Sequence, residues 1–267
     1  MPLHHLIALA LIQGITEFLP ISSSGHLALY PLLTGAPDQG LEIDVAVHVG
    51  ALAAVVLYMR AEVGSAARGG FRLLRGDAAG EEPRLALLLA AATVPAVVAG
   101  GLLWALDLTD ALRSLAVIGW ATLIGGVLLE LADRFGARRK AAAEWGWRDA
   151  ILMGLAQAVA LIPGTSRSGA TITAARALGY GRVEAARLSM LMSIPTILAA
   201  GTLLTLKLVR DGDAALGLDA AIAAGLAFLS AFAAILVFMK MLETWSMTVF
   251  TVYRVVLGVG LLALAYS

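Results

Sequence analysis

Two short polar segments interrupt long apolar stretches of this sequence, and their residue types suit the chemistry of phosphate groups. The first, residues 13–26, reads QGITEFLPISSSGH, and the second, residues 163–171, reads PGTSRSGAT. In each segment a proline ends one helix, and the serines or threonines after it can begin another. The unpaired N–H groups and the positive dipole at a helix start favour an anion. Both segments therefore predict a helix start that binds an anion.

The first segment offers the reacting groups of a phosphoryl transfer. Gln13 and Glu17 are four residues apart and share one helix face, and His26 follows three residues after Ser23. A hydroxyl, an imidazole and a carboxylate at an anion site are the parts that nucleophilic phosphoryl transfer needs. We expect Ser23 to attack phosphorus while Glu17 or His26 takes its proton. Direct attack by a water that Glu17 and His26 activate is the alternative.

The second segment supplies a cation. Guanidinium donors match phosphate oxygens in pairs, and phosphoryl transfer depends above all on positioning and charge neutralisation. We therefore expect Arg167 to complete the catalytic group by holding the phosphates, and Thr171, one turn later, can face the same anion. The residues expected to bind the substrate through polar side chains are Gln13, Ser22, Ser24, Thr165, Ser166, Ser168 and Thr171.

These residues also have structural interpretations. Serines after a proline commonly cap a helix, and small residues in membrane helices allow close packing. A charged side chain at the bilayer centre costs about 2.5–3.5 kcal/mol on insertion scales, so Glu17 and Arg167 indicate function unless they only pair with each other. Arg254, in the second turn of the last apolar segment, is expected to snorkel to the membrane surface rather than to catalyse.

The elements that carry these residues must lie in a membrane. Sixty per cent of the 267 residues are hydrophobic and only 14% are charged, whereas soluble domains carry roughly a quarter charged residues. The chain has no cysteine and a formal net charge of zero, which excludes thiolate chemistry and gives no field that attracts nucleic acid. Since a spanning helix needs about 20 apolar residues, the predicted spans are 43–60, 84–106, 113–132, 185–208, 216–240 and 248–266.

Two further apolar stretches, about 3–33 and 150–180, are long enough to span but are broken by the polar segments. Irregular backbone at membrane depth is tolerated only where protein or a water-filled cavity satisfies it. Each stretch is therefore predicted to form a re-entrant helix hairpin. The fold class is thus an all-α membrane protein with six transmembrane helices and two such hairpins.

Loop charges predict the orientation of the chain. Lys and Arg gather in cytoplasmic loops, and the basic segments 61–84 and 133–149 are assigned to that face. The acidic connections 107–112 and 211–219 are assigned to the outside. With this assignment the first hairpin opens from the outside, the second opens from the cytoplasm, and both termini lie outside.

The two hairpins resemble each other in sequence. Residues 13–25 and 157–169 both run from Gln to Ser-x-Ser-Gly, at a constant offset of 157 − 13 = 144 residues. We expect one membrane domain, residues 1–267, built as an inverted-topology repeat of about 1–110 and 145–267 that a basic cytoplasmic loop joins. In such proteins the binding site lies at the repeat interface near the midplane.

QGITEFLPISSSGHL at 13–27 and PGTSRSGAT at 163–171 closely resemble the two signature motifs of the bacterial undecaprenyl-diphosphate phosphatase family linked to bacitracin resistance. VPAVVAG at 94–100, IPTILAAG at 194–201, the length and the order of spans are also similar to that family. The resemblance implies six spans and two re-entrant hairpins in interlocked inverted repeats. It also implies hydrolysis of undecaprenyl diphosphate to undecaprenyl phosphate, which recycles the lipid carrier for cell-wall synthesis.

By position, the resemblance implies that Glu17 is the essential acid, Ser23 the proposed nucleophile and His26 the motif histidine. Arg167 matches the phosphate-binding arginine. Mg2+ or Ca2+ is the implied cofactor, but the family often has Glu where this chain has Gln13, and a neutral amide binds a cation less strongly. The sequence shows no self-sufficient metal site, with Glu17 as its one candidate ligand.

The implied setting is the bacterial inner membrane, with an active site that opens toward the periplasmic face. The expected partners are the undecaprenyl diphosphate lipid and membrane lipids, and bacitracin acts on the same substrate. No nucleic acid is expected. The sequence leaves open whether the chain forms a homo-oligomer. The rival class is a lipid-phosphate transporter or flippase that uses the same pocket without cleaving its cargo, because opposed hairpins are also transporter architecture. A purely structural scaffold leaves Glu17 and Arg167 unexplained.

Overall fold

The structure is a computed structural model that describes residues 2–35, 40–108, 111–210 and 217–267. Within these ranges the chain folds into helices, without a β-strand. The α-helices are α1 (Leu3–Thr16), α2 (Ser23–Thr34), α3 (Gly40–Tyr58), α4 (Arg60–Leu74), α5 (Glu81–Ala105), α6 (Leu115–Phe135), α7 (Trp147–Val159), α8 (Arg167–Ala177), α9 (Arg182–Arg210), α10 (Leu218–Thr244) and α11 (Thr248–Tyr266). Two 3-10 helices, η1 (Ala111–Arg113) and η2 (Ala142–Glu144), lie in connections.

The predicted membrane character is confirmed. In the described part of the chain, 5 helices are long and apolar enough to cross a membrane: α5, α6, residues 182–202 of α9, α10 and α11. The predicted span 43–60 corresponds to α3, which passes the same test only together with α4, and the two are bent by 93°. The count becomes 6 if that bent pair is one span. The predicted outer connections include residues 109–110 and 211–216, which lie outside the described ranges.

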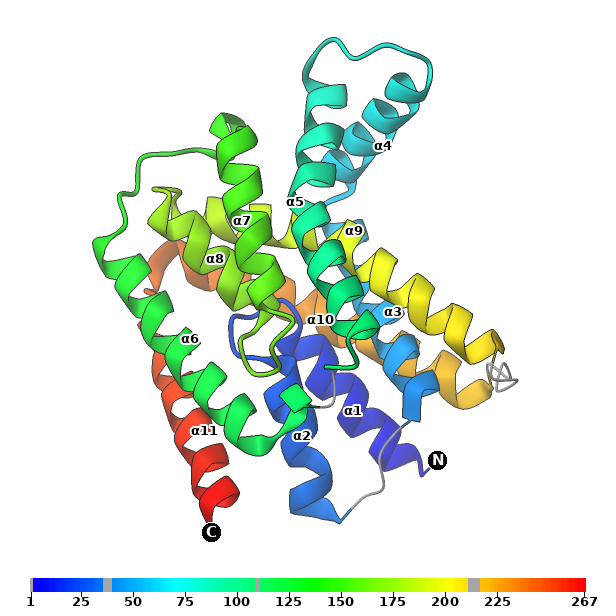
Figure 1. Cartoon of the computed structure of the whole chain (residues 1–267), viewed down its shortest axis with the longest axis vertical. Coiled ribbons are helices and arrows are strands. Elements are labelled where there is room, and N and C mark those ends of the chain that lie inside the picture. The colour runs from blue at the N-terminus through cyan, green and yellow to red at the C-terminus, as the bar shows by residue number, and fades with distance from the viewer. Residues whose placement is uncertain (1, 36–39, 109–110, 211–216) are drawn as a thin grey trace.

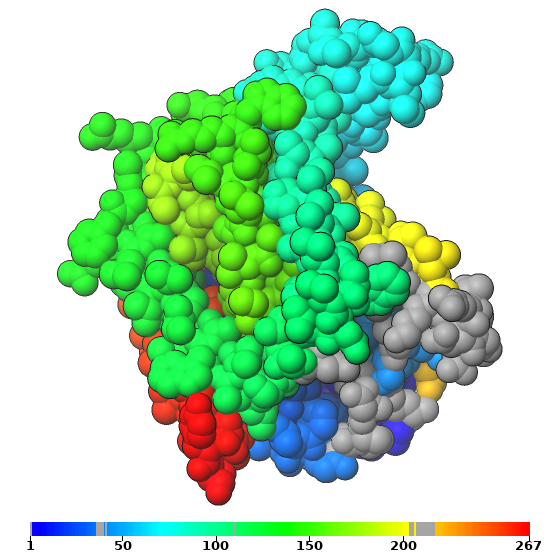
Figure 2. Space-filling model, in the orientation of Figure 1, coloured from blue at the N-terminus to red at the C-terminus, as the bar shows by residue number. Residues whose placement is uncertain are grey.

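The predicted loop over 61–84 is wrong for its first half, because residues 60–74 form α4. Small residues between the arginines let α4 pack directly on α5: a Cβ added to Gly69 would lie 2.0 Å from the carbonyl oxygen of Glu82. Arg68 then reaches the Glu82 carboxylate at 2.7 Å. Figure 2 shows α4 and the start of α5 protruding from the rest of the molecule.

The two broken hairpins meet inside the bundle. Figure 1 shows the α1–α2 turn and the α7–α8 turn side by side near the centre, while the start of α1 and the end of α11 lie at one end and the α4–α5 connection lies at the other. Residues of both hairpins, Phe18 and Ile172 among them, belong to the main hydrophobic core. The turn between α1 and α2 is largely buried, whereas residues 160–163 of the turn between α7 and α8 are partly exposed.

Candidate functional site

Ser22 and Ser166 begin the two central helices in the same way. Their φ angles are 72° and 68°, in a region that residues other than glycine rarely adopt. The Ser22 Oγ accepts the N–H of Gly25 at 3.3 Å, and the Ser166 Oγ accepts the N–H of Gly169 at 3.1 Å. Both serines are therefore N-caps, 166 − 22 = 144 residues apart, and the structural interpretation of a serine as a cap is confirmed for these two.

Ser24 and Ser168 join the hairpins to each other. The backbone N–H of Gly164 donates to the Ser24 Oγ at 2.9 Å, and the Ser168 hydroxyl donates to the carbonyl oxygen of Leu19 at 2.7 Å. Each serine thus bonds the turn of the opposite hairpin. The hydroxyls predicted to bind substrate here already have a structural partner.

Glu17 is the centre of the polar cluster. Its Oε1 lies 2.8 Å from the Nη2 of Arg167, and its Oε2 accepts the amide Nε2 of Gln13 at 2.7 Å. The hydroxyl of Ser23 lies 3.5 Å from the same Oε2. The structure therefore brings together four of the predicted residues, two of them opposite charges from different hairpins, in a largely buried position.

His26 faces the last helix and not Ser23. Its Nδ1 lies 2.7 Å from the carbonyl oxygen of Ser22, its Nε2 lies 2.5 Å from the hydroxyl of Tyr253, and the two rings stack with centroids 5.5 Å apart. Both ring nitrogens thus have partners, so the expected reach from His26 to the Ser23 hydroxyl is not the arrangement found. The spacing alone could not show this, because Tyr253 is 227 residues away in the chain.

Thr171 contacts the backbone of Arg167 and a serine of α9. Its hydroxyl donates to the Arg167 carbonyl oxygen at 2.9 Å and lies 2.6 Å from the hydroxyl of Ser189 in α9. The Arg167 Nη1 donates to the Ser189 carbonyl oxygen at 3.4 Å. Thr171 and Ser189 thus support the arginine rather than line an open pocket. Ser189 was not singled out from the sequence, although a serine inside an apolar span is a signal for it.

Arg254 does not snorkel; that prediction is wrong. Its side chain is 0% exposed, its Nε donates to the carbonyl oxygen of Thr122 at 3.0 Å, and its Nη2 donates to that of Thr165 at 2.8 Å. Thr165, predicted to bind substrate, therefore contributes its carbonyl to a buried contact. Backbone carbonyls of α6 and of the turn before α8 accept from the Nε and Nη2 of the guanidinium, which holds it inside the protein.

The cluster does not form a resident metal site. The described residues hold no group of three or more His, Asp or Glu that could bind an ion. Glu17 is the one carboxylate here, and Arg167 already matches its charge at 2.8 Å. The Oε1 of Gln13 is buried and has no hydrogen-bond partner among the residues that the structure describes, but Mg2+ requires about six oxygen ligands. The residues present do not fit the cation that the family resemblance implies.

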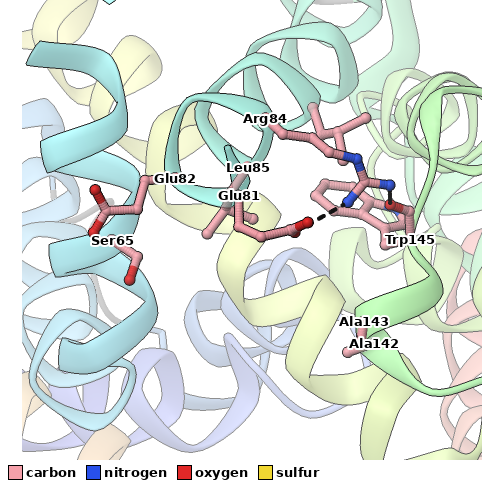
Figure 3. Close-up of a pocket in the computed structure, with 9 residues that line it drawn as sticks. Ser65, Glu81, Glu82, Arg84, Leu85, Ala142, Ala143 and Trp145 are labelled. Atoms are coloured by element: carbon pink, nitrogen blue, oxygen red, sulfur yellow. Dashed lines mark hydrogen bonds and ion pairs between the residues drawn. The ribbon is translucent and has the colours of Figure 1, made fainter. Parts of the chain in front are cut away.

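Two cavities lie elsewhere in the molecule. One of about 200 Å³ opens between α4, α5 and η2 (Figure 3), where Arg84 donates to the Trp145 carbonyl oxygen at 2.8 Å. The other, of about 300 Å³, has an apolar lining from α4, α5 and α9. None of the predicted site residues lines either cavity. The candidate site is therefore located by its polar cluster and not by these two cavities.

Comparisons with known proteins cover the whole chain. A family model described as "Bacitracin resistance protein BacA" matches residues 6–260. The undecaprenyl-diphosphatase of Roseobacter denitrificans is 54% identical over 267 residues, and that of Dinoroseobacter shibae is 57% identical over 267 residues; both alignments cover 100% of each chain. Undecaprenyl-diphosphatase 1 of Rhodospirillum rubrum is 49% identical over 274 residues, which cover 100% of this chain and 96% of the relative. Both serine-rich segments lie inside the matched region.

Proposed function

The chain belongs to the bacitracin resistance protein BacA family, and we propose that it removes the terminal phosphate of undecaprenyl diphosphate. The products are undecaprenyl phosphate, which returns to cell-wall synthesis, and inorganic phosphate. The observation that carries this proposal is the buried cluster of Glu17, Ser23 and Arg167 at the meeting point of two serine-capped helix starts. A nucleophile and a phosphate-binding cation lie there within hydrogen-bond reach of one carboxylate, which serves as the base.

Binding begins with an exchange of partners at Arg167. Anionic phosphate oxygens take the place of the Glu17 carboxylate at the guanidinium, and the free N–H groups at the starts of α2 and α8 hold further oxygens. The exchange leaves Glu17 without its cation, next to the Ser23 hydroxyl 3.5 Å away. Such hydrogen bonds are often long before substrate binds. The ion pair is therefore the resting state of the site.

The reaction is a two-step displacement. The Ser23 Oγ forms a bond to the terminal phosphorus, Glu17 takes the hydroxyl proton, and the bond from phosphorus to the bridging oxygen breaks, so that undecaprenyl phosphate leaves. Water then attacks the phosphorus of the phosphoseryl group and the bond from phosphorus to the Ser23 Oγ breaks; Glu17 returns its proton to that oxygen, and inorganic phosphate leaves with the protons of the water. Direct attack by a Glu17-activated water is the alternative route. In both routes Glu17 is the base, because both ring nitrogens of His26 are engaged elsewhere.

The same residues support the proposal of six spans in an inverted-topology repeat. Ser22 and Ser166 share a rare backbone conformation at the 144-residue offset, and each hairpin turn bonds a serine of the other. The packing is also crossed, since α1 packs on α10 and α7 packs on α5. The loop charges support an orientation in the bacterial inner membrane in which the site opens to the periplasm.

In the proposed reaction, divalent cations bind only together with the substrate. Mg2+ is usually held by one or two carboxylates together with substrate phosphates, so Mg2+ or Ca2+ arrives with the diphosphate. No step of the proposed reaction depends on a resident ion.

The deciding experiment is phosphate release by the purified protein in detergent, where no membrane remains to be crossed. The enzyme releases inorganic phosphate from undecaprenyl diphosphate under these conditions. A transporter that uses the same pocket binds the lipid and releases none. Binding without release would therefore overturn the phosphatase proposal in favour of transport.

A further inference from the structure

Arg254 is a buried cation of α11 that the proposed reaction does not use. Besides Thr122 and Thr165, it bonds the carbonyl oxygen of Gly164, which lies 3.3 Å from its Nη2. Gly164 and Thr165 form the turn that leads into α8 and its first residue, Arg167. One planar guanidinium thus ties α11 to α6 and to this turn.

The surrounding backbone is shaped to admit this guanidinium. A Cβ added to Gly125 of α6 would lie 2.2 Å from the Arg254 Nη2, and a Cβ added to Gly169 of α8 would lie 2.5 Å from its Nη1. A Cβ at Gly126 would lie 2.9 Å from the Cβ of Arg254. Any larger residue at these positions would displace the side chain, so both neighbouring helices leave room for it.

The turn that Arg254 contacts is held from both sides. The Gly164 carbonyl oxygen accepts from Arg254 and from the Thr122 hydroxyl, the latter at 3.1 Å, while the Gly164 N–H donates to Ser24. Gly164 has a φ of 95°, which a residue with a Cβ rarely adopts. The direction in which α8 leaves this turn sets where the Arg167 side chain lies.

The charge of Arg254 has no carboxylate partner in the described ranges, and its Nη1 has no hydrogen-bond partner there. A buried charge without a counter-ion carries a desolvation cost of several kcal/mol. A neutral donor would hold a carbonyl at lower cost. The planar guanidinium of arginine can donate to several carbonyl oxygens on two segments at once. The compact ammonium group of a lysine cannot span the same carbonyls.

We propose that Arg254 is a positioning residue for the phosphatase reaction: its guanidinium fixes the Gly164–Thr165 turn and thereby the start of α8 and the location of Arg167. This inference rests on the proposed function. Arg254 does not touch the substrate. Because Arg167 and the α8 start act most strongly on the charge of the transition state, their displacement lowers kcat more than it weakens substrate binding.

The test compares Arg254→Lys and Arg254→Gln with the wild type in detergent, on monodisperse protein, by kcat, KM, thermal midpoint and inhibition by vanadate. Vanadate adopts the five-coordinate geometry of a phosphoryl-transfer transition state. We expect kcat to fall at least about tenfold in both variants, since small misplacements cost this much, while KM stays within about twofold. The vanadate inhibition constant rises by a factor similar to the loss in kcat.

Thr251→Val is the matched control. Thr251 lies one turn before Arg254 and donates to the Gly126 carbonyl oxygen at 3.2 Å, so it also joins α11 to α6, but it does not bond the turn. This variant keeps its kcat. Should the Arg254 variants fail to fold, Thr122→Val removes the other hydrogen bond to the Gly164 carbonyl, and kcat falls several-fold at unchanged KM.

Wild-type kcat and vanadate affinity in Arg254→Lys would overturn the inference, because the charge alone would then suffice. A fall in thermal midpoint with full turnover per folded molecule would overturn it too. Either result leaves the proposed function standing, whereas a wild type that binds the lipid but releases no phosphate removes the function itself.

Discussion

The Nη2 of Arg167 lies 2.8 Å from the Oε1 of Glu17, and this ion pair joins the start of α8 to the break after α1, 150 residues earlier in the chain. The side chains are only 15% and 8% exposed. Removing one partner of a buried pair leaves an uncompensated charge and strongly destabilises the fold. Tests of this site must therefore separate stability from turnover.

Single changes at the pair, Glu17→Gln and Arg167→Ala, are expected to lower phosphate release by about 10²-fold or more, because a general base contributes about 10²–10⁴-fold and the arginine neutralises phosphate charge. Each also lowers the thermal midpoint. The control is the double variant Glu17→Gln/Arg167→Gln, in which no charge is left unpaired. We expect it to regain stability but not activity; recovered turnover would mean that the pair is only structural.

Ser23→Ala tests the covalent route. If the Ser23 Oγ attacks phosphorus, the variant loses nearly all turnover, and rapid acid quenching of the wild type with substrate labelled in the terminal phosphate traps a phosphoserine at residue 23. Ser193→Ala is the control, because Ser193 is buried in α9 and its hydroxyl donates to the Met190 carbonyl oxygen. Substantial turnover in Ser23→Ala would favour water as the attacking group.

The caps at Ser22 and Ser166 predict a specific pattern of stabilities. Replacing either by Ala removes the cap and places an alanine at positive φ, so the loss exceeds the roughly 1 kcal/mol of an ordinary cap. Ser114 is the control: it caps α6 with a φ of −68°. Glycine is tolerated at positive φ. We therefore expect the difference in stability between the Gly and the Ala variant to be larger at Ser22 and Ser166 than at Ser114. Equal margins in thermal unfolding would contradict this account.

His26→Gln and Tyr253→Phe test whether His26 is a base or an anchor of α2. Since the Tyr253 hydroxyl lies 2.5 Å from the Nε2 of His26, we expect each variant to lower kcat less than about tenfold, well below the effect of losing a general base. The two losses do not add in the double variant, because both remove one contact. A loss in His26→Gln as large as that in Glu17→Gln would identify the imidazole as the base instead.

Removal of divalent cations tests whether an ion is bound to the substrate-free protein or binds together with the substrate. Because the described part of the chain offers no metal-binding group, we expect EDTA to leave the thermal midpoint of the substrate-free protein unchanged and to lower phosphate release. Added Mg2+ restores the rate. A thermal midpoint that falls with EDTA would show a structural ion.

The sequence by itself determined the membrane class, the central helix starts and the residues that carry charge into the interior. Hydropathy over about 20 residues, the break at a proline and the capping serine are short-range effects, and they require no knowledge of the packing. These short-range effects predicted the five helices that satisfy the span test, which lie between α5 and α11, and the caps at Ser22 and Ser166. The Glu17–Arg167 pair was foreseen only as an alternative to function.

Only the tertiary structure decided the partners of His26 and Arg254. Their contacts join residues 227 and 132 positions apart, and Arg254 stays buried because α6 and α8 bring glycines and free carbonyls against it. An arginine near the start of an apolar segment otherwise follows the local rule and reaches for water. Where a side chain finds its partner on another helix, the packing of the helices overrides that rule.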